Sequence, residues 1–185
     1  MSRCRRITLV ALAALATCSI VCEAQTANFE GTKIVDLNQF VGDWYIVAST
    51  PASGTSVNKC GHFVVKKLSE NTFAMKYTAV SHKRNSPVVF NANGTVGDDV
   101  TETWQLEGST KFIGPIKQII IEGNYDSYLA TVLSGEKTAN FANHRIAMIW
   151  SRDKRLSSFV VDKLKRKLSQ YANKKDIFTI DQSSC

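Results

Sequence analysis

The apolar positions of this chain gather in short runs that turn signals separate. The runs are rich in aromatic and β-branched residues, which favour a pleated, half-buried strand. The breaks between them contain the Gly, Asn and Pro residues that tight reversals require. We therefore expect strands at residues 43–51, 60–68, 72–80, 87–95, 101–106, 116–122, 125–134 and 144–152.

A single helical pattern follows these strands. Residues 156–171 place apolar side chains at helical spacing, and Ser157 or Ser158 can cap the start. Eight short strands joined in sequence predict an up-and-down antiparallel sheet, either an eight-stranded β-barrel or a β-sandwich. The helix favours the barrel, because the outside of a barrel offers a surface for its apolar face. We expect one all-β domain with this C-terminal α-helix packed outside, and a last short strand at residues 177–180.

The N-terminus has the pattern of a secretory signal peptide. Arg3, Arg5 and Arg6 precede an uncharged apolar run at residues 7–22, and Ala24 supplies a small residue for cleavage. The run is short for a membrane span of about 20 residues, so a retained anchor is the weaker alternative. We expect residues 1–24 to be removed, the domain at residues 25–185 to be secreted, and no membrane span in the mature chain.

The chain is basic, with a formal net charge of +7. Such a balance affects solubility and attraction to acidic surfaces without identifying a partner. Many of the Lys and Arg residues lie between Arg152 and Lys175, where a solvated helix face is the favoured interpretation. Contact with an anionic surface through this basic helix is the alternative. No aromatic residues interleave the charges, so we expect no nucleic-acid binding.

Two cysteines remain after removal of the signal peptide. Cys60 and Cys185 in a secreted chain most simply form one disulfide. Chain-entropy reasoning gives so long a loop about 4 to 5 kcal/mol of stabilisation. Asn93, Gly94 and Thr95 form a sequon, which predicts a glycan on Asn93.

Little in the chain indicates catalysis. His62, His82 and His144 lie on separate segments without the spacing of metal ligands, and no Gly-x-Ser-x-Gly elbow occurs. We predict no catalytic residue, no metal site and no permanent cofactor.

Three motifs resemble, in order and spacing, the signature regions of the lipocalins: Gly42-x-Trp44 on the first strand, the turn at 123–128 with Tyr125 and Asp126, and Arg152 after the last strand. Gly123 and Asn124 stand where the family usually has Thr-Asp. Residues 176–185 resemble the tail of the apolipoprotein D and insect bilin-binding branch. The resemblance also implies a clip between Cys60 and a tail cysteine.

The resemblance implies that Trp44 plugs the barrel floor and that Arg152 packs over it. Alternation along the strands then turns Ile46 and Ala48 inward on the first strand. It also turns Ile146, Met148 and Trp150 inward on the last strand. Lys76 is expected to point outward, because burying an unpaired charge is costly, and this places Phe73, Met75 and Tyr77 inward. The predicted cavity lining is Ile46, Ala48, Phe73, Met75, Tyr77, Phe90, Trp104, Ile146, Met148 and Trp150.

An apolar interior of this kind suits a small hydrophobic ligand, such as a lipid, a sterol, a retinoid or a bilin-like pigment. We therefore expect a binding or transport protein, either a monomer or a weak dimer. Two alternatives remain open. One is a secreted lipocalin that acts through its surface as a protein-binding inhibitor or signal. The other, a lipid isomerase, needs a free nucleophile in the cavity.

Overall fold

A computed structural model describes residues 35–52, 57–97, 101–135 and 145–185, and the predicted signal peptide lies outside these ranges. The strands are β1 (Gly42–Ser49), β2 (Lys59–Lys67), β3 (Thr72–Val80), β4 (Pro87–Val96), β5 (Thr101–Leu106), β6 (Pro115–Asn124), β7 (Tyr128–Gly135), β8 (Arg145–Ser151) and β9 (Phe178–Thr179). The helices are α1 (Leu37–Phe40), α2 (Ser158–Leu168) and the short 3-10 turns η1 (Gly108–Ile113) and η2 (Lys174–Asp176).

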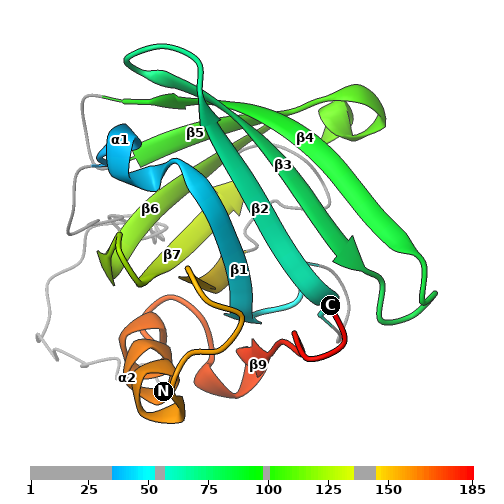
Figure 1. Ribbon diagram of the computed structural model, residues 1–185, viewed down its shortest axis with the longest axis vertical. Helices are drawn as coiled ribbons and strands as arrows, with labels where there is room; N and C mark the ends of the chain where they lie inside the picture. The colour runs from blue at the N-terminus through cyan, green and yellow to red at the C-terminus, as the bar shows by residue number, and fades with distance from the viewer. Residues whose placement is uncertain (1–34, 53–56, 98–100, 136–144) are drawn as a thin grey trace, which may run out of the picture.

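The sheet closes on itself. Each strand from β2 to β7 pairs with the strand that follows it in antiparallel fashion, and β1 pairs with β8 on one side and with β2 on the other. The ninth strand, β9, adds two residue pairs to β1. Figure 1 shows α1 at one end of the barrel, the β3–β4 turn at the opposite end, and α2 outside. The predicted eight-stranded antiparallel barrel with an external C-terminal helix is confirmed.

Alternation along the strands sorts the buried apolar side chains into two groups. The inner cluster fills part of the barrel and contains Phe40, Trp44, Phe63, Phe73, Trp104 and Trp150 among its largest members. The outer cluster lies between the barrel wall and α2, and includes Val47, Ile119, Ala130 and Ile149. Lys76 is exposed between buried Met75 and Tyr77, as the sequence predicts.

Helix α2 begins at a capped residue and buries one stripe. The Ser157 hydroxyl accepts a hydrogen bond from the Val160 amide at 3.3 Å, which satisfies an otherwise unpaired donor. Val161, Leu164 and Leu168 are buried in the outer cluster. The apolar spacing predicted for residues 156–171 thus corresponds to the stripe that packs against the barrel. The helix itself ends at Leu168.

The basic face of α2 is partly engaged within the fold. Lys163 Nζ lies 2.5 Å from Glu122 on β6, and Lys167 Nζ lies 3.7 Å from the same carboxylate. The hydrogen bond from Lys163 lowers the pKa of Glu122. Phe159 on this helix is 75% exposed. The contact with an anionic surface therefore stays a prediction.

Several element boundaries differ from the prediction. Strand β7 begins at Tyr128 rather than at residue 125, because the Ser127 amide donates to the Asn124 carbonyl at 3.0 Å and makes a tight turn. Strand β9 covers only two residues. The predicted start of the eighth strand at residue 144 lies outside the described residues.

The predicted disulfide is present. Cys60 and Cys185 are bonded across a sequence separation of 125 residues. The bond ties the chain end to the start of β2. Nearby, Gln182 donates from Nε2 to the Ile46 and Gly61 carbonyls, at 2.9 Å each, so the tail is held to β1 and β2 by polar contacts as well.

If α2 stabilises the barrel through its buried stripe, Leu164→Ala should lower the free energy of unfolding by about 2 to 5 kcal/mol, because it leaves a cavity in the outer cluster. Phe159→Ala, on the exposed face of the same helix, should change it by less than about 0.5 kcal/mol. Urea denaturation of both variants checks this. Equal effects would show that α2 is not docked as described.

Candidate functional site

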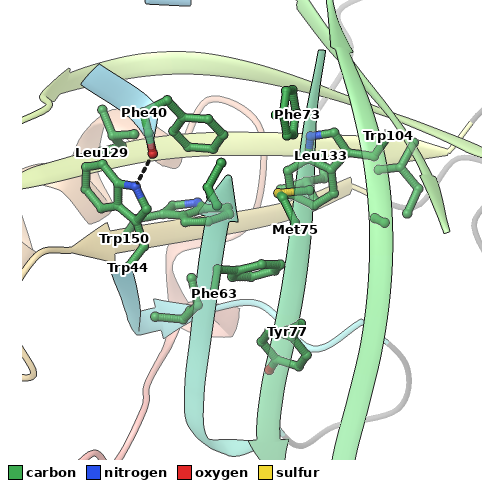
Figure 2. Close-up of a cluster of buried hydrophobic side chains, with 14 of the residues drawn as sticks. Phe40, Trp44, Phe63, Phe73, Met75, Tyr77, Trp104, Leu129, Leu133 and Trp150 are labelled. Atoms are coloured by element: carbon green, nitrogen blue, oxygen red, sulfur yellow. Dashed lines mark hydrogen bonds between the residues drawn. The ribbon is translucent and has the colours of Figure 1, made fainter. Parts of the chain in front are cut away.

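The closed end of the barrel is built around Trp44 and Arg152. The Arg152 guanidinium lies 3.7 Å from the centre of the Trp44 ring, where a cation is attracted to the face of an indole. The indole Nε1 donates to the Phe40 carbonyl at 2.8 Å, as Figure 2 shows. Trp44 is fully buried. The two residues therefore seal the floor of the barrel.

Arg152 also ties three segments of the floor together. Its Nε, Nη1 and Nη2 donate to the backbone carbonyls of Tyr125, Asp43 and Gln39, at 2.9, 3.0 and 2.6 Å. Gly42 has a φ of +107°, which favours glycine, and a Cβ there would come within 3.1 Å of Arg152 Nη1.

The turn residues of the motif complete the floor. The Tyr125 hydroxyl accepts from the Asp36 amide at 3.1 Å, and burial raises the pKa of Tyr125 to about 12. Burial lowers the pKa of Arg152. The negative charge of Asp126, which is exposed, opposes this shift. The motif residues thus lie together at the closed end and form its structural support.

Aromatic side chains fill the barrel interior next to this floor (Figure 2). Trp150 stacks on Phe63 with ring centres 4.5 Å apart and meets Trp44 and Trp104 edge to face. Phe73 meets Phe40 edge to face at 5.7 Å. Such pairs add to the free energy gained from burial. The part of the barrel next to the closed end is therefore filled by its own side chains.

The part of the barrel toward the open end holds a cavity of about 520 Å³. This volume lies in the range of about 300 to 1,000 Å³ that is usual for small-molecule sites. Its walls are mostly apolar, and the polar side chains among them are Asn58, Tyr77 and Thr110. The lining residues are Ala52, Asn58, Phe63, Tyr77, Val88, Phe90, Trp104, Leu106, Thr110, Ile113, Ile116, Leu133, Ile146 and Met148.

A second pocket, of about 340 Å³, adjoins the cavity at the open end. The two share Ala52, Asn58, Tyr77 and Met148 in their walls. The second pocket is more polar and includes Lys83 and Arg84 from the β3–β4 turn. Residues from the segments after β1 and β3 therefore line this pocket at the open end, next to the cavity.

The predicted lining residues fall into groups at different depths. Tyr77, Phe90, Trp104, Ile146 and Met148 line the cavity, and Ile46 lines the pocket at its mouth. Phe73, Met75 and Trp150 belong to the packed layer below. Phe73, for example, covers Gly94 so closely that a Cβ there would lie 2.1 Å from its ring.

Ala48 is a correction. It lies in the outer cluster, on the side of α2, rather than inside the barrel. The pairing between β1 and β8 shifts after Ile46, which faces Trp150, so that Ala48 faces Ile149. A bulge adds one residue to a strand and reverses the alternation beyond it. Ser49 consequently takes the inward position and lines the mouth pocket.

A buried polar pair lies on β5 and β6, beside the cavity-lining residues Trp104 and Ile116. Glu102 on β5 and Gln118 on β6 face each other across the two strands and are both fully buried. Trp104 Nε1 and Gln118 Nε2 donate to Glu102 Oε2 at 3.2 and 3.1 Å. Burial raises the pKa of Glu102 to about 8, and the bond from Trp104 opposes this rise only in part.

Sequence reasoning missed this pair and several wall residues. Trp104 was predicted to face inward, and the same alternation turns Glu102, two positions earlier, to the same face. Phe63 alternates with His62 and Val64 on β2 and lies opposite Trp44, so its inward direction was also readable. The contributions of Ile113 and Thr110 depend on the short turn η1, which the sequence pattern did not predict.

The remaining candidate positions lie outside the barrel. Asn93 is exposed on β4 and donates from Nδ2 to Glu107 at 2.5 Å, so its glycan stays a prediction. His62 lies 2.9 Å from Asp43, while His144 is outside the described residues.

Within the described part of the chain, no group of three or more His, Cys, Asp or Glu could hold a metal ion. No helix among the described residues is long and apolar enough to cross a membrane.

No protein-family model and no curated protein matches this sequence. Solved structures do match the fold. Lobster apocrustacyanin A1 superposes with a TM-score of 0.64 at 18% identity, over 80% of this chain and 81% of that chain. Insecticyanin from the tobacco hornworm Manduca sexta gives a TM-score of 0.65 at 15% identity, over 82% and 83%.

A structure of the amine-binding protein of Rhodnius prolixus in complex with tryptamine is also similar, with a TM-score of 0.63 and 14% identity, over 81% of this chain and 83% of that chain. Identities this low establish a shared fold and nothing more. The chain therefore has the lipocalin-like barrel that the sequence resemblance implied.

If Arg152 acts through its three carbonyl contacts, Arg152→Lys should lower the free energy of unfolding by about 2 kcal/mol, because a lysine keeps the charge but cannot span them. Arg155→Lys, at an exposed position three residues further along the chain, should be neutral within about 0.5 kcal/mol. Chemical denaturation separates them. A neutral Arg152→Lys would show that only the charge matters.

If Glu102 is protonated in the fold, stability should decrease as pH rises from about 5 to 8, because its native pKa of about 8 exceeds its ordinary value of 4.5 and the native state holds the extra proton. The expected contribution is about 1.4 kcal/mol per pH unit. Glu102→Gln should remove this slope, and Glu107→Gln, which is exposed, should keep it. Urea titrations at several pH values measure both, and an unchanged slope in Glu102→Gln would contradict the assignment.

Proposed function

We propose that this protein binds a small hydrophobic ligand in the barrel cavity and acts as a secreted carrier or sequestering protein. The observation that supports this most is the apolar cavity of about 520 Å³ above a packed aromatic floor. The closed end is filled by aromatic side chains, so the cavity lies in the other part of the barrel, where a small molecule can be accommodated.

The physical basis is the removal of apolar ligand surface from water. This contributes roughly 25 cal/mol per Å² before the costs of association are deducted. Because barrel strands and the Trp44–Arg152 floor hold the walls in place, little ordering cost is left for the binding step. The polar mouth with Lys83 and Arg84 tolerates a ligand whose outer end is hydrated.

Secretion and family branch belong to the same proposal. The pattern of residues 1–24 supports a signal peptide, and the Cys60–Cys185 bond suits an oxidising compartment. The three motifs and the tail support a lipocalin of the apolipoprotein D and bilin-binding branch. Among the structural neighbours, the Rhodnius prolixus protein is a tryptamine complex, which supports a small-molecule role for this barrel.

A catalytic role has less support. The isomerase alternative needs a free nucleophile in the cavity, and the two cysteines outside the predicted signal peptide are bonded to each other. The proposal therefore assigns binding without a reaction and without a permanent cofactor.

The test is a pair of substitutions on β4 that differ only in the face they modify. Val88 lines the cavity, whereas its neighbour Val89 is 56% exposed. Val88→Phe should place extra volume in the cavity and weaken binding at least tenfold, while Val89→Phe leaves it unchanged. Calorimetric titration with a fatty acid, a sterol, a retinoid and a tetrapyrrole measures the effect.

Two results would contradict the proposal. One is that none of the four ligand classes binds to the wild-type protein in a saturable way. The other is that a ligand binds and both valine variants bind it equally well, which would place the site outside the barrel. Near-UV circular dichroism of each variant confirms that the barrel is intact.

A further inference from the structure

The polar pair Glu102 and Gln118 lies beside residues of the cavity wall, although neither of the two lines the cavity itself. In the register of the sheet, Glu102 faces Gln118, Gln118 faces Leu133, and Leu133 faces Ile146. Leu133 and Ile146 both line the cavity. Trp104 and Ile116, each two positions away on the same strands, line it as well. By strand alternation the pair therefore faces the barrel interior and adjoins these wall residues.

One oxygen of each side chain in the pair lacks a hydrogen-bond partner. Glu102 Oε1 and Gln118 Oε1 are buried, and no partner is present for either atom among the described residues. Burying a polar atom without a partner costs about 1 to 3 kcal/mol. Since buried polar groups in native proteins are almost always satisfied, one unpaired oxygen on each of two neighbouring side chains requires an explanation. A ligand that carries donors into this corner supplies one.

We infer that Glu102 and Gln118 form a subsite for the ammonium group of an apolar primary amine whose body fills the cavity; this rests on the ligand-binding function proposed above. The subsite consists of the two unpartnered oxygens and the carboxylate charge of Glu102. The apolar body lies against Trp104, Leu133 and Ile146 in the cavity.

The chemistry of the two side chains selects an amine over other polar groups. An ammonium group has three donors and no acceptor, so it pairs with two oxygens without adding an unsatisfied lone pair. A hydroxyl donates once and introduces acceptors of its own. Desolvation and the bond from Trp104 account for the pKa of Glu102, and no cation among the described residues contributes to it. The corner therefore lacks a positive partner for the carboxylate.

Trp104 separates the subsite from the main cavity. Its ring lines the cavity while its Nε1 donates to Glu102 at 3.2 Å, which is at the long end of the usual range. An entering ammonium group competes for the same carboxylate, so a small movement of Trp104 admits it. Binding of an amine should consequently change the environment of Trp104.

Binding should also release a proton. Glu102 is neutral at pH 7, because its pKa is about 8, and it ionises when it pairs with the ammonium group. Tyr125, with a pKa raised to about 12, keeps its proton in this range. Hydrogen bonding to Gln39 lowers the pKa of Asp36, so Asp36 is already ionised. The carboxyl proton of Glu102 is thus the one released, while the amine keeps its own.

The experiment compares three probes of matched shape, 4-phenylbutylamine, 4-phenylbutan-1-ol and n-pentylbenzene, by calorimetry at pH 7. Wild-type protein should bind the amine at least tenfold more tightly than the other two, with about one proton released, measured in buffers of different ionisation enthalpy. Glu102→Gln should lose the preference and the proton release. Glu107→Gln, a surface control, should keep both.

Each outcome decides between the two claims. If n-pentylbenzene binds and the amine gains nothing, the cavity is a ligand site and the amine subsite is overturned. If Glu102→Gln keeps the preference for the amine, the subsite is overturned as well. If wild-type protein binds 4-phenylbutan-1-ol as tightly as 4-phenylbutylamine, the subsite does not select an ammonium group. If no probe binds, both the subsite and the proposed function fail.

A second variant protects the test against misfolding of Glu102→Gln. Gln118→Leu removes one of the two oxygens and leaves the carboxyl in place, so the preference for 4-phenylbutylamine should fall by about fivefold while the proton release remains. Near-UV circular dichroism reports whether each variant is folded. A preference that is unchanged in Gln118→Leu would exclude its oxygen from the subsite.

Discussion

The double pairing of β1 is the constraint on which the rest of the structure depends. This strand hydrogen-bonds to β8 on one side and to β2 on the other, and so converts an open sheet into a closed wall. In a closed wall the strand alternation has a defined inside and outside. The inner and outer clusters, and the hollow between opposite walls, follow from this closure.

The two ends of the barrel differ in how completely side chains fill the interior. At the closed end, Arg152 and Trp44 hold backbone segments from α1, β1 and the β6–β7 turn together, and large aromatic rings leave no room between the walls. Toward the open end, side chains of moderate size such as Val88 and Leu133 do not reach across, and a cavity remains. The fold thus combines a packed floor with a cavity, and Trp104, which lines the cavity, is hydrogen-bonded to Glu102 of the buried polar pair.

Much of this arrangement could be predicted from the residues. The motif Gly42-x-Trp44 and the distant Arg152 located the floor, and the charge of Lys76 fixed the register of β3. The count of two cysteines after the predicted signal peptide was enough to predict the disulfide. Ala48 was misplaced because a bulge after Ile46 shifts the alternation, and consecutive apolar residues do not mark such a bulge. Glu102 was missed because charged residues are usually solvated, and only the register next to Trp104 shows that this one is buried.

The three tryptophans provide the most direct test of the central claim, because they lie at different depths of the same interior. Trp104 lines the cavity, Trp150 lies in the packed layer, and Trp44 seals the floor. The measurement is a nuclear magnetic resonance titration that follows the three indole N–H signals while a hydrophobic ligand is added. The account predicts a saturable shift that is largest for Trp104 and smallest for Trp44. The absence of a saturable shift with every ligand class, or a shift as large at Trp44 as at Trp104, would contradict it.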